Sequence, residues 1–225
     1  MAARALSLEI ICDLEILHRC NHGRKTIGIT GTNGKSTTTA LVGHILSEGD
    51  KSVAVGGNIG TAVLDLQMPS PDGFFVFEIS SYQMDLCPTF RPDIAVLLNI
   101  TPDHLDRHGN FKNYAAAKER IFEGEGLAGI CLDDEPCRKI YERLLAFENG
   151  NRRIRPFSFE GAVEEGVYVE EGVVFDARNG EGKEAGSIIG FTTLRGSHNH
   201  QNAAAAFSIC ASKDIGMQAA DILKH

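Results

Sequence analysis

The sequence predicts an α/β fold, in which a mostly parallel sheet is flanked by helices and carries a small antiparallel β element. Several short runs are continuously apolar rather than alternating, as expected for strands that are buried on both faces. Helical patterns separate several of these runs, which is typical of right-handed crossovers between parallel strands. With 225 residues, of which 43% are hydrophobic and 23% charged, the chain can bury one core of ordinary size.

The apolar runs predict strands at residues 25–30, 52–56, 73–80, 94–100 and 126–132. A helix is expected directly after the first strand, because residues that can pack recur there at helical spacing, namely Thr38, Leu41, Val42, Ile45 and Leu46. Further helices are expected at residues 114–122 and 135–147. Ligands of such sheets bind beyond the carboxyl ends of the strands, so the polar residues that follow these runs are candidates for a site.

The stretch after residue 160 changes character. Residues 166–175 look like a β-hairpin and residues 179–182 form a turn cluster, so an antiparallel element at about residues 153–195 is expected at one edge of the sheet. The alternative to this β element is a mobile, acidic segment on the surface. From His198 the chain is expected to be helical until Gly216, and a short amphipathic piece follows at residues 217–223.

We expect one domain at residues 23–215, preceded by a lead or linker at residues 1–22. Residues 216–225 would form the carboxyl-terminal end of that domain. The sequence contains no internal repeat and no low-complexity linker that would indicate a second domain.

The charge and the cysteines exclude several classes of protein. A formal net charge of -8 argues against a surface for nucleic acid or anionic membrane, which needs clustered Lys and Arg. No window approaches the ~18–20 apolar residues of a membrane span and no signal peptide is visible, so a cytoplasmic protein is expected. The six cysteines show no CxxC pair and no zinc spacing, which predicts free thiols in a reducing compartment.

Residues 30–37 read Thr-Gly-Thr-Asn-Gly-Lys-Ser-Thr and predict a phosphate-binding loop between the first strand and its helix. Gly31 and Gly34 would let backbone N–H groups approach phosphate oxygens, Lys35 would reach the terminal phosphates, and Ser36 would offer a hydroxyl to Mg²⁺. Ile29 occupies the place where the usual pattern has its first glycine. The alternative is a glycine-rich turn in which Lys and Ser occur by chance.

Two further groups follow strands. Glu78 ends an apolar strand and is a natural hard ligand for Mg²⁺, although a solvated or hydrogen-bonded strand end is the alternative. Asp103, His104, Asp106 and His108 crowd metal-capable atoms after another strand. His104 and His108 lie four apart, as zinc ligands on a helical face do, but no Glu-x-x motif or cysteine supports zinc.

Two helices carry the remaining candidates. Lys118 lies in an apolar helical stripe, where a lysine either snorkels to solvent or, if buried near metals, loses its proton and reacts with CO₂ to give a carbamate ligand. Asn199 and Asn202 lie three apart near a helix start, where their amides could read adenine. The alternative is that Asn199 only caps the helix.

Six motifs in this order resemble the Mur ligase family, ATP-dependent amide-forming enzymes of peptidoglycan synthesis. They are Gly31-Thr-Asn-Gly-Lys-Ser-Thr37, Gly57-Asn-Ile-Gly60, Phe77-Glu-Ile-Ser-Ser-Tyr-Gln83, Asn99-Ile-Thr-Pro-Asp-His-Leu-Asp106, Tyr114-Ala-Ala-Ala-Lys118 and His198-Asn-His-Gln-Asn202. They extend over nearly the whole chain. The third motif is similar to that of the members that add D-glutamate, whereas alanine-adding relatives carry a His in the phosphate loop.

The resemblance implies a role for each matching residue. ATP would contact Gly31, Thr32, Asn33, Gly34, Lys35, Ser36, Thr37, Asn199 and Asn202. Ser36 and Glu78 would hold one Mg²⁺, and a carbamylated Lys118 with His104 and Glu78 a second. The UDP-muramoyl substrate would lie towards Asn58, Ser80, Gln83 and His104. Lys35, His104 and Lys118 would be catalytic.

The resemblance also implies the reaction and the partners. A carboxylate of UDP-N-acetylmuramoyl-L-alanine would attack the γ-phosphoryl of ATP, and the amine of D-glutamate would then open the acyl phosphate. The family's N-terminal and C-terminal domains are not recognised in the sequence, so we expect the isolated chain to be inactive. The sequence does not give the oligomeric state, and a monomer is the expectation. Another ligase of the superfamily, of folylpolyglutamate or cyanophycin type, and a nucleotide-binding module without chemistry of its own are the alternatives.

Overall fold

The computed structural model describes residues 8–21, 23–146, 152–191 and 196–224. These residues form a mixed sheet with the strand order β2-β3-β1-β4-β5-β6-β7-β8-β9. The strands are β1 (Lys25–Thr30), β2 (Val53–Gly57), β3 (Phe74–Glu78), β4 (Ile94–Leu97), β5 (Gly126–Cys131), β6 (Arg152–Ser158), β7 (Val167–Glu170), β8 (Val173–Asp176) and β9 (Lys183–Ser187). The predicted α/β fold with a mostly parallel sheet is confirmed.

The centre of the sheet is parallel and buried on both faces. Strand β1 pairs with β3 on one side and β4 on the other, both in parallel. Ile29 lies opposite Glu78, and Thr30 lies opposite Leu97. All residues of β3 and β4 are buried, which accounts for their continuously apolar sequences. The carboxyl ends of these strands therefore meet at one edge, where the loop after β1 begins.

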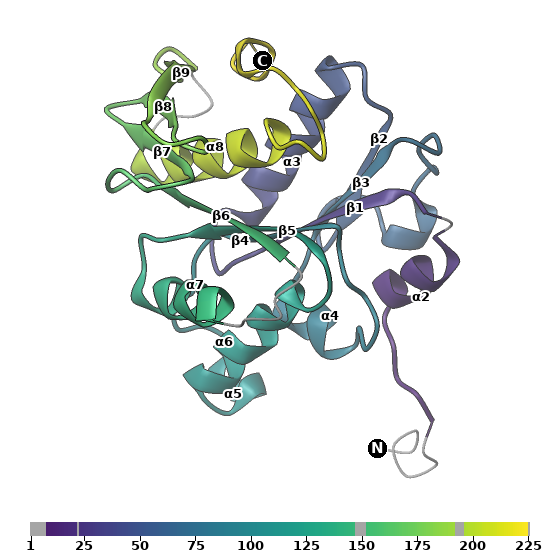
Figure 1. Ribbon diagram of the computed structural model, residues 1–225. Coiled ribbons are helices and arrows are strands. Elements are labelled where there is room, and N and C mark those ends of the chain that lie inside the picture. Colours follow the sequence, from purple (N-terminus) through teal and green to yellow (C-terminus); the bar gives the residue numbers. More distant parts are fainter. Residues whose placement is uncertain (1–7, 22, 147–151, 192–195, 225) are drawn as a thin grey trace.

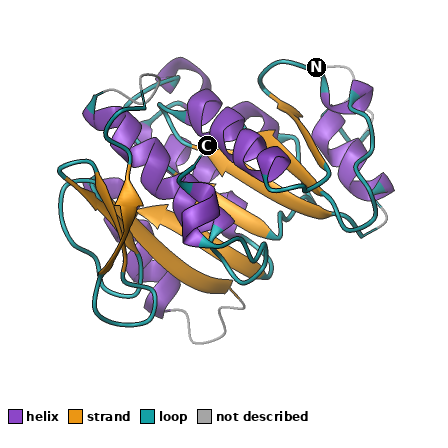
Figure 2. Cartoon of the chain, turned by 90° about the horizontal axis from the view of Figure 1, so that it is seen from above, coloured by secondary structure: helices purple, strands orange, loops and turns teal. Residues whose placement is uncertain are grey.

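Helices cover both faces of the sheet (Figures 1 and 2). Figure 1 shows α3 and α8 on one face and α2, α4, α6 and α7 on the other. The bounds are α2 (Asp13–Cys20), α3 (Lys35–Glu48), α4 (Ser81–Asp85), α5 (Leu105–His108), α6 (Phe111–Glu119), α7 (Glu135–Ala146), α8 (Ser197–Cys210) and α9 (Ala219–Ile222), with short 3-10 turns at Val63–Asp65 and Arg120–Phe122.

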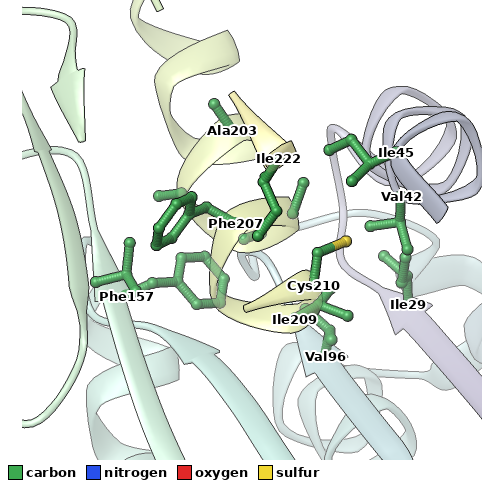
Figure 3. Close-up of a cluster of buried hydrophobic side chains, with 14 of the residues drawn as sticks. Ile29, Val42, Ile45, Val96, Phe157, Ala203, Phe207, Ile209, Cys210 and Ile222 are labelled. Atoms are coloured by element: carbon green, nitrogen blue, oxygen red, sulfur yellow. The ribbon is translucent and has the colours of Figure 1, made fainter. Parts of the chain in front are cut away.

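Two apolar layers hold this arrangement together. On one face, Val42 and Ile45 of α3 and Phe207 and Ile209 of α8 pack with Ile29 and other side chains of the sheet (Figure 3). On the other face, side chains of α2, α4, α6 and α7 pack against those of the same strands that point the opposite way. Since each strand contributes alternate residues to the two layers, the sheet is fixed from both sides.

The predicted antiparallel element is confirmed, but its extent is wrong. Strands β7, β8 and β9 pair antiparallel at one edge of the sheet. Strand β6 pairs parallel with β5 from Arg152 to Phe157 and parallel with β7 at Phe157 and Ser158, so residues 153–158 belong to the parallel part. Residues 192–195, which the sequence prediction included in the element, lie outside the described residues.

The sequence prediction counted the residues of β6 within the antiparallel element, and it did not predict helix α2. Arg152, at the start of β6, is buried and donates hydrogen bonds to backbone carbonyls, among them those of Pro92, Phe122 and Leu127. Helix α2 lies within the expected lead and buries Leu14 and Leu17. No helix in the described part of the chain has the length and apolar character needed to span a bilayer.

Candidate functional site

The loop after β1 turns directly into α3, as predicted. Gly34 precedes the first residue of the helix and has a φ of 80°, a conformation that favours glycine. A Cβ at Gly34 would also lie 2.4 Å from Oδ1 of Asn202. The first N–H groups of α3 have no partner within the helix and carry the positive end of its dipole. The loop therefore offers a place for an anion, and any side chain at Gly34 would distort it.

Asn99, which follows β4, anchors the loop from the neighbouring strand. Its Oδ1 accepts hydrogen bonds from the backbone N–H groups of Thr32 (3.1 Å) and Asn33 (2.8 Å). Its Nδ2 donates to the Asn33 carbonyl (3.1 Å) and to Oε1 of Gln201 on α8 (2.7 Å). Asn99 and Gln201 stood within recognised motifs but were not candidate site residues. Only the pairing of β1 with β4 brings Asn99 under the loop.

Thr32 is the second attachment point of the loop. Its hydroxyl lies 3.1 Å from the hydroxyl of Tyr114, a buried side chain on α6, and accepts a hydrogen bond from the Thr101 N–H at 3.0 Å. Burial raises the pKa of Tyr114 above its ordinary value, so it stays protonated as a neutral partner. The loop is thus held by side chains from the segment after β4 and from α6.

Lys35 folds back over the loop. Its Nζ donates to the carbonyl of Thr32 at 2.8 Å. Burial lowers its pKa, while the nearby carboxylates of Glu78 and Asp103 act in the opposite direction. The ammonium group is consequently half-buried beside the loop N–H groups, where it can neutralise the charge of a bound phosphate.

Glu78 is buried rather than solvated, with 3% of its surface exposed. Its Oε2 accepts a hydrogen bond from Ser36 Oγ at 2.6 Å, and its Oε1 accepts one from Asn58 Nδ2 at 2.9 Å. The strand end is therefore hydrogen-bonded and not solvated, which leaves the hydrogen-bonded form of the alternative beside the metal-ligand prediction. A carboxylate and a hydroxyl in contact beside a loop that offers a place for an anion are the hard oxygen donors that suit Mg²⁺.

Lys118 does not snorkel to solvent, because only 2% of its surface is exposed. Its Nζ donates to the Gly31 carbonyl at 2.7 Å and lies 4.8 Å from the centre of the Tyr114 ring. Burial, and secondarily the charge of Lys35, lower the pKa of Lys118 to about 7. A substantial fraction of neutral amine is therefore present near pH 7, directly beneath the loop.

The two histidines do not share a helical face in the expected way. His104 is the N-cap of α5, with a φ of 49°, and its side chain is 47% exposed, with Nε2 3.5 Å from Asp103 Oδ2. His108 is buried, and its Nε2 lies 3.0 Å from Ser81 Oγ. Within the described ranges no group of three or more His, Cys, Asp or Glu side chains could hold a metal, so the zinc alternative finds no ligand set.

Ser80 and Gln83, which the sequence places near a substrate, form the capping box of α4. The Gln83 N–H donates to Ser80 Oγ at 3.2 Å, and the Ser80 N–H donates to Gln83 Oε1 at 3.1 Å. Both residues follow β3, as Glu78 does, and so lie at the same edge of the sheet as the loop. Their contacts fix the start of α4 there.

Asn199 and Asn202 lie together near the start of α8. Asn202 Nδ2 donates to Asn199 Oδ1 at 3.0 Å, and Asn202 Oδ1 accepts from Thr38 Oγ1 at 3.0 Å. Gly196 is the N-cap of α8, so the alternative that Asn199 caps the helix is wrong. Asn202 is buried and contacts the first turn of α3. It therefore supports the loop, in addition to its predicted role in reading adenine.

Comparisons with known proteins agree on one family. A sequence model described as Mur ligase middle domain matches residues 29–210. The curated UDP-N-acetylmuramoylalanine–D-glutamate ligase of Chelativorans sp. (strain BNC1) is 45% identical over 224 residues, which cover 98% of this chain and 47% of that protein. The chain spans about half the length of the curated relatives it matches.

Solved structures show the same fold. The UDP-N-acetylmuramate:L-alanyl-gamma-D-glutamyl-meso-diaminopimelate ligase from Neisseria meningitides has a TM-score of 0.70 at 22% identity, covering 99% of this chain and 72% of that one. The MurF ligase from Thermotoga maritima in complex with ADP has a TM-score of 0.64 at 22% identity, covering 94% of this chain and 51% of that one.

Proposed function

This chain belongs to the Mur ligase family, through its middle domain, and we propose that it is the nucleotide-binding part of an enzyme that joins D-glutamate to UDP-N-acetylmuramoyl-L-alanine at the expense of ATP. The relatives at 42–45% identity that carry this activity in their names support the choice of substrates. One observation carries the proposal more than any other. Lys35, Ser36 and Glu78 gather around a loop whose N–H groups are held in place by Asn99.

ATP is the proposed ligand of the loop. The N–H groups at the start of α3 would contact phosphate oxygens, and the Lys35 ammonium would move from the Thr32 carbonyl to the β- and γ-phosphates. Ser36 and Glu78 fit Mg²⁺, because both supply oxygen atoms and already lie 2.6 Å apart. Mg²⁺ held there would neutralise charge on the transferred phosphoryl group. These groups act by position and charge, which is what phosphoryl transfer requires.

The reaction joins two anions, so neutralisation should supply much of the catalysis. The substrate carboxylate attacks the γ-phosphoryl of ATP to give an acyl phosphate, and the amine of D-glutamate then opens that intermediate with release of phosphate. Lys35 would stabilise the charge that moves to the leaving oxygens. Asn58, Ser80, Gln83 and His104 would lie towards the muramoyl substrate, because they follow strands that end beside the loop.

Lys118 is the proposed site of a carbamate. Its lowered pKa, about 7, provides the neutral amine that reacts with CO₂, and its Nζ lies directly under Gly31. The carbamate oxygens, with Glu78 and His104, would then be candidates to hold a second Mg²⁺. In the full-length enzyme, Lys118→Ala should lose activity that a short-chain carboxylic acid partly restores. If ¹³CO₂ gives no carbamate signal in the wild type and Lys118→Ala keeps full activity, this role is wrong.

The proposed ATP site is tested by calorimetry with Mg-ATP on the wild type and on Lys35→Ala. Loss of one charge-assisted contact worth ~1.5–3 kcal/mol should weaken binding roughly 10- to 100-fold. Lys25→Ala is the matched control, because Lys25 is an exposed lysine at the opposite end of β1, where it contacts the Asp214 carbonyl. Equal affinity of the wild type and Lys35→Ala would contradict the role of the loop.

The proposed substrates need a separate test on the full-length enzyme. Phosphate release from ATP should require both UDP-N-acetylmuramoyl-L-alanine and D-glutamate, and replacement of D-glutamate by L-glutamate or by meso-diaminopimelate should reduce it to background. Equal release with meso-diaminopimelate would place the protein in another branch of the family.

A further inference from the structure

Two thiols lie in contact on the face of the sheet that carries α2 and α4. Cys12, which precedes α2, has its Sγ 3.2 Å from Sγ of Cys87, which follows α4. A disulfide bond is ~2.05 Å long, so the two sulfur atoms need to approach by only about 1 Å to bond. The residues are 75 positions apart in the chain, and the fold alone brings them together.

The backbone on both sides of this pair is held in place. The Cys12 N–H donates to the Leu86 carbonyl at 3.1 Å. The buried carboxylate of Glu15, one turn into α2, accepts hydrogen bonds from the N–H groups of Thr89 and Phe90 at 3.1 and 3.0 Å. Arg120 donates to the Cys87 carbonyl at 3.2 Å. The closeness of the sulfur atoms is therefore a property of the packed structure and not of a free side chain.

The two thiols differ in the way that a reactive pair requires. Cys12 is partly exposed, whereas Cys87 is buried. The contact with Cys87 lowers the pKa of Cys12 to about 7, and the same contact and burial raise the pKa of Cys87. Since the thiolate is the nucleophile, Cys12 would react first with an oxidant and Cys87 would be the resolving partner.

We propose that Cys12 and Cys87 are a redox pair that hydrogen peroxide converts to a disulfide, which ties the segment before α2 to the end of α4. The Cys12 thiolate attacks one peroxide oxygen, the O–O bond breaks, and the protonated leaving oxygen departs as water. The Cys87 sulfur then displaces the hydroxyl of the Cys12 sulfenic acid, which leaves as a second water with the Cys87 proton. The two thiols lose two electrons and the peroxide gains them.

A disulfide between Cys12 and Cys87 would affect helix α4, which borders the candidate site. Cys12 Sγ lies 3.8 Å from the carbonyl of Gln83, and Arg120 also donates to the Met84 carbonyl at 2.7 Å. The disulfide would therefore fasten the end of α4, the helix that Ser80 and Gln83 begin. It would also close a long loop of the chain, which stabilises the folded state relative to the unfolded one.

The test exposes the protein to hydrogen peroxide and maps its thiols by alkylation and mass spectrometry. We expect the intact mass to fall by two hydrogen atoms, a peptide containing Cys12 linked to a peptide containing Cys87, and a higher melting temperature than after treatment with a dithiol reductant. In Cys87→Ser the link should be absent, and dimedone should label Cys12. Free Cys12 and Cys87 after peroxide treatment, with oxidation of Cys20 instead, would overturn the proposal.

Two variants separate the pair from chance oxidation. Cys20→Ser removes the exposed cysteine and should leave the mass change and the link as in the wild type. Cys12→Ser should abolish both while its reduced melting temperature stays near that of the reduced wild type. A peroxide-dependent link that survives in Cys12→Ser, or that is lost in Cys20→Ser, would assign the chemistry to another cysteine.

Discussion

Helix α8 contacts the rest of the molecule differently along its length. Near its start, Gln201 accepts a hydrogen bond from Asn99 and Asn202 accepts one from Thr38, so this turn supports the loop. From Ala203 to Cys210 every residue is buried, and the helix packs beside α3 against the same face of the sheet (Figure 3). The polar turn thus positions the site, while the apolar remainder supplies stability. Substitutions in the two regions should separate binding from folding.

The largest effect is expected in the apolar region. Phe207→Ala removes a buried aromatic ring and should lower the free energy of unfolding by about 3–5 kcal/mol, measured by urea denaturation. Phe207→Leu should lose less, because it leaves a smaller cavity. The folded fraction of both variants should bind Mg-ATP as the wild type does. A loss of affinity equal to that of Lys35→Ala would break the separation between the two regions.

The next effect concerns Lys118, the buried charge beneath the loop. Its pKa is about 7 in the folded protein and ~10.4 in an unfolded chain. Between these values the unfolded state keeps a proton that the folded state has lost, so the free energy of unfolding rises with pH. Below pH 7 both states carry the proton and this contribution is constant.

Lys118→Met removes that titration. From pH 7 to pH 9 the wild type should gain stability over the variant by up to about 1.4 kcal/mol per pH unit, measured by denaturation at each pH. Lys112→Met, an exposed lysine on the same helix, is the control and should run parallel to the wild type. If the stability of Lys118→Met changed with pH in parallel with that of the wild type, the amine of Lys118 would be solvated.

A smaller loss of stability is expected at Asn99, with a clear loss of binding. Asn99→Ala frees two loop N–H groups that water can reach in part, so stability should fall by about 1 kcal/mol. Affinity for Mg-ATP should fall about tenfold, which corresponds to ~1.4 kcal/mol. Asn110→Ala, which removes the N-cap of α6, should cost similar stability and leave affinity unchanged. Equal affinities of the two variants would show that Asn99 does not hold the loop.

The smallest effect is expected on the surface, just beyond the end of α8. Arg153 and Asp214 form a 2.7 Å ion pair on the surface, with half of the Arg153 side chain exposed. Asp214→Asn should change stability by no more than about 1 kcal/mol, and the change should shrink as salt is added. Affinity for Mg-ATP should not change. A loss of stability above about 1 kcal/mol would mean that this surface ion pair stabilises the fold as much as the contacts of the polar turn of α8 do.

The sequence predicted the parallel strands and the loop because local patterns specify them. The apolar runs of β1, β3, β4 and β5 are buried on both faces, and the glycines and Lys35 of the loop are adjacent in the chain. Strand β6 was assigned to the antiparallel element because its parallel pairing with β5 depends on tertiary packing. Only the packed structure supplies the carbonyl groups that satisfy Arg152.

The candidate site was predictable where one segment carries it, and not where distant segments meet. Glu78 and Lys118 were recognised as candidates, but only their burial excludes the solvated alternatives, and burial depends on tertiary packing. Asn99 and Tyr114 reach Thr32 across 66 or more positions of the chain, so no local pattern marks their contact with the loop. The contact between Cys12 and Cys87 was missed for the same reason.

The most direct test of the account is the titration of Lys118 by NMR, with ¹³C-labelled lysine in the protein without nucleotide. The account holds that the groups beneath the loop are buried against it before any ligand binds, and it predicts a midpoint at about pH 7 for the Lys118 signal. The signal is assigned by its absence from Lys118→Met. A midpoint near the ordinary lysine value of ~10.4 would show that the amine is solvated, and would contradict the account.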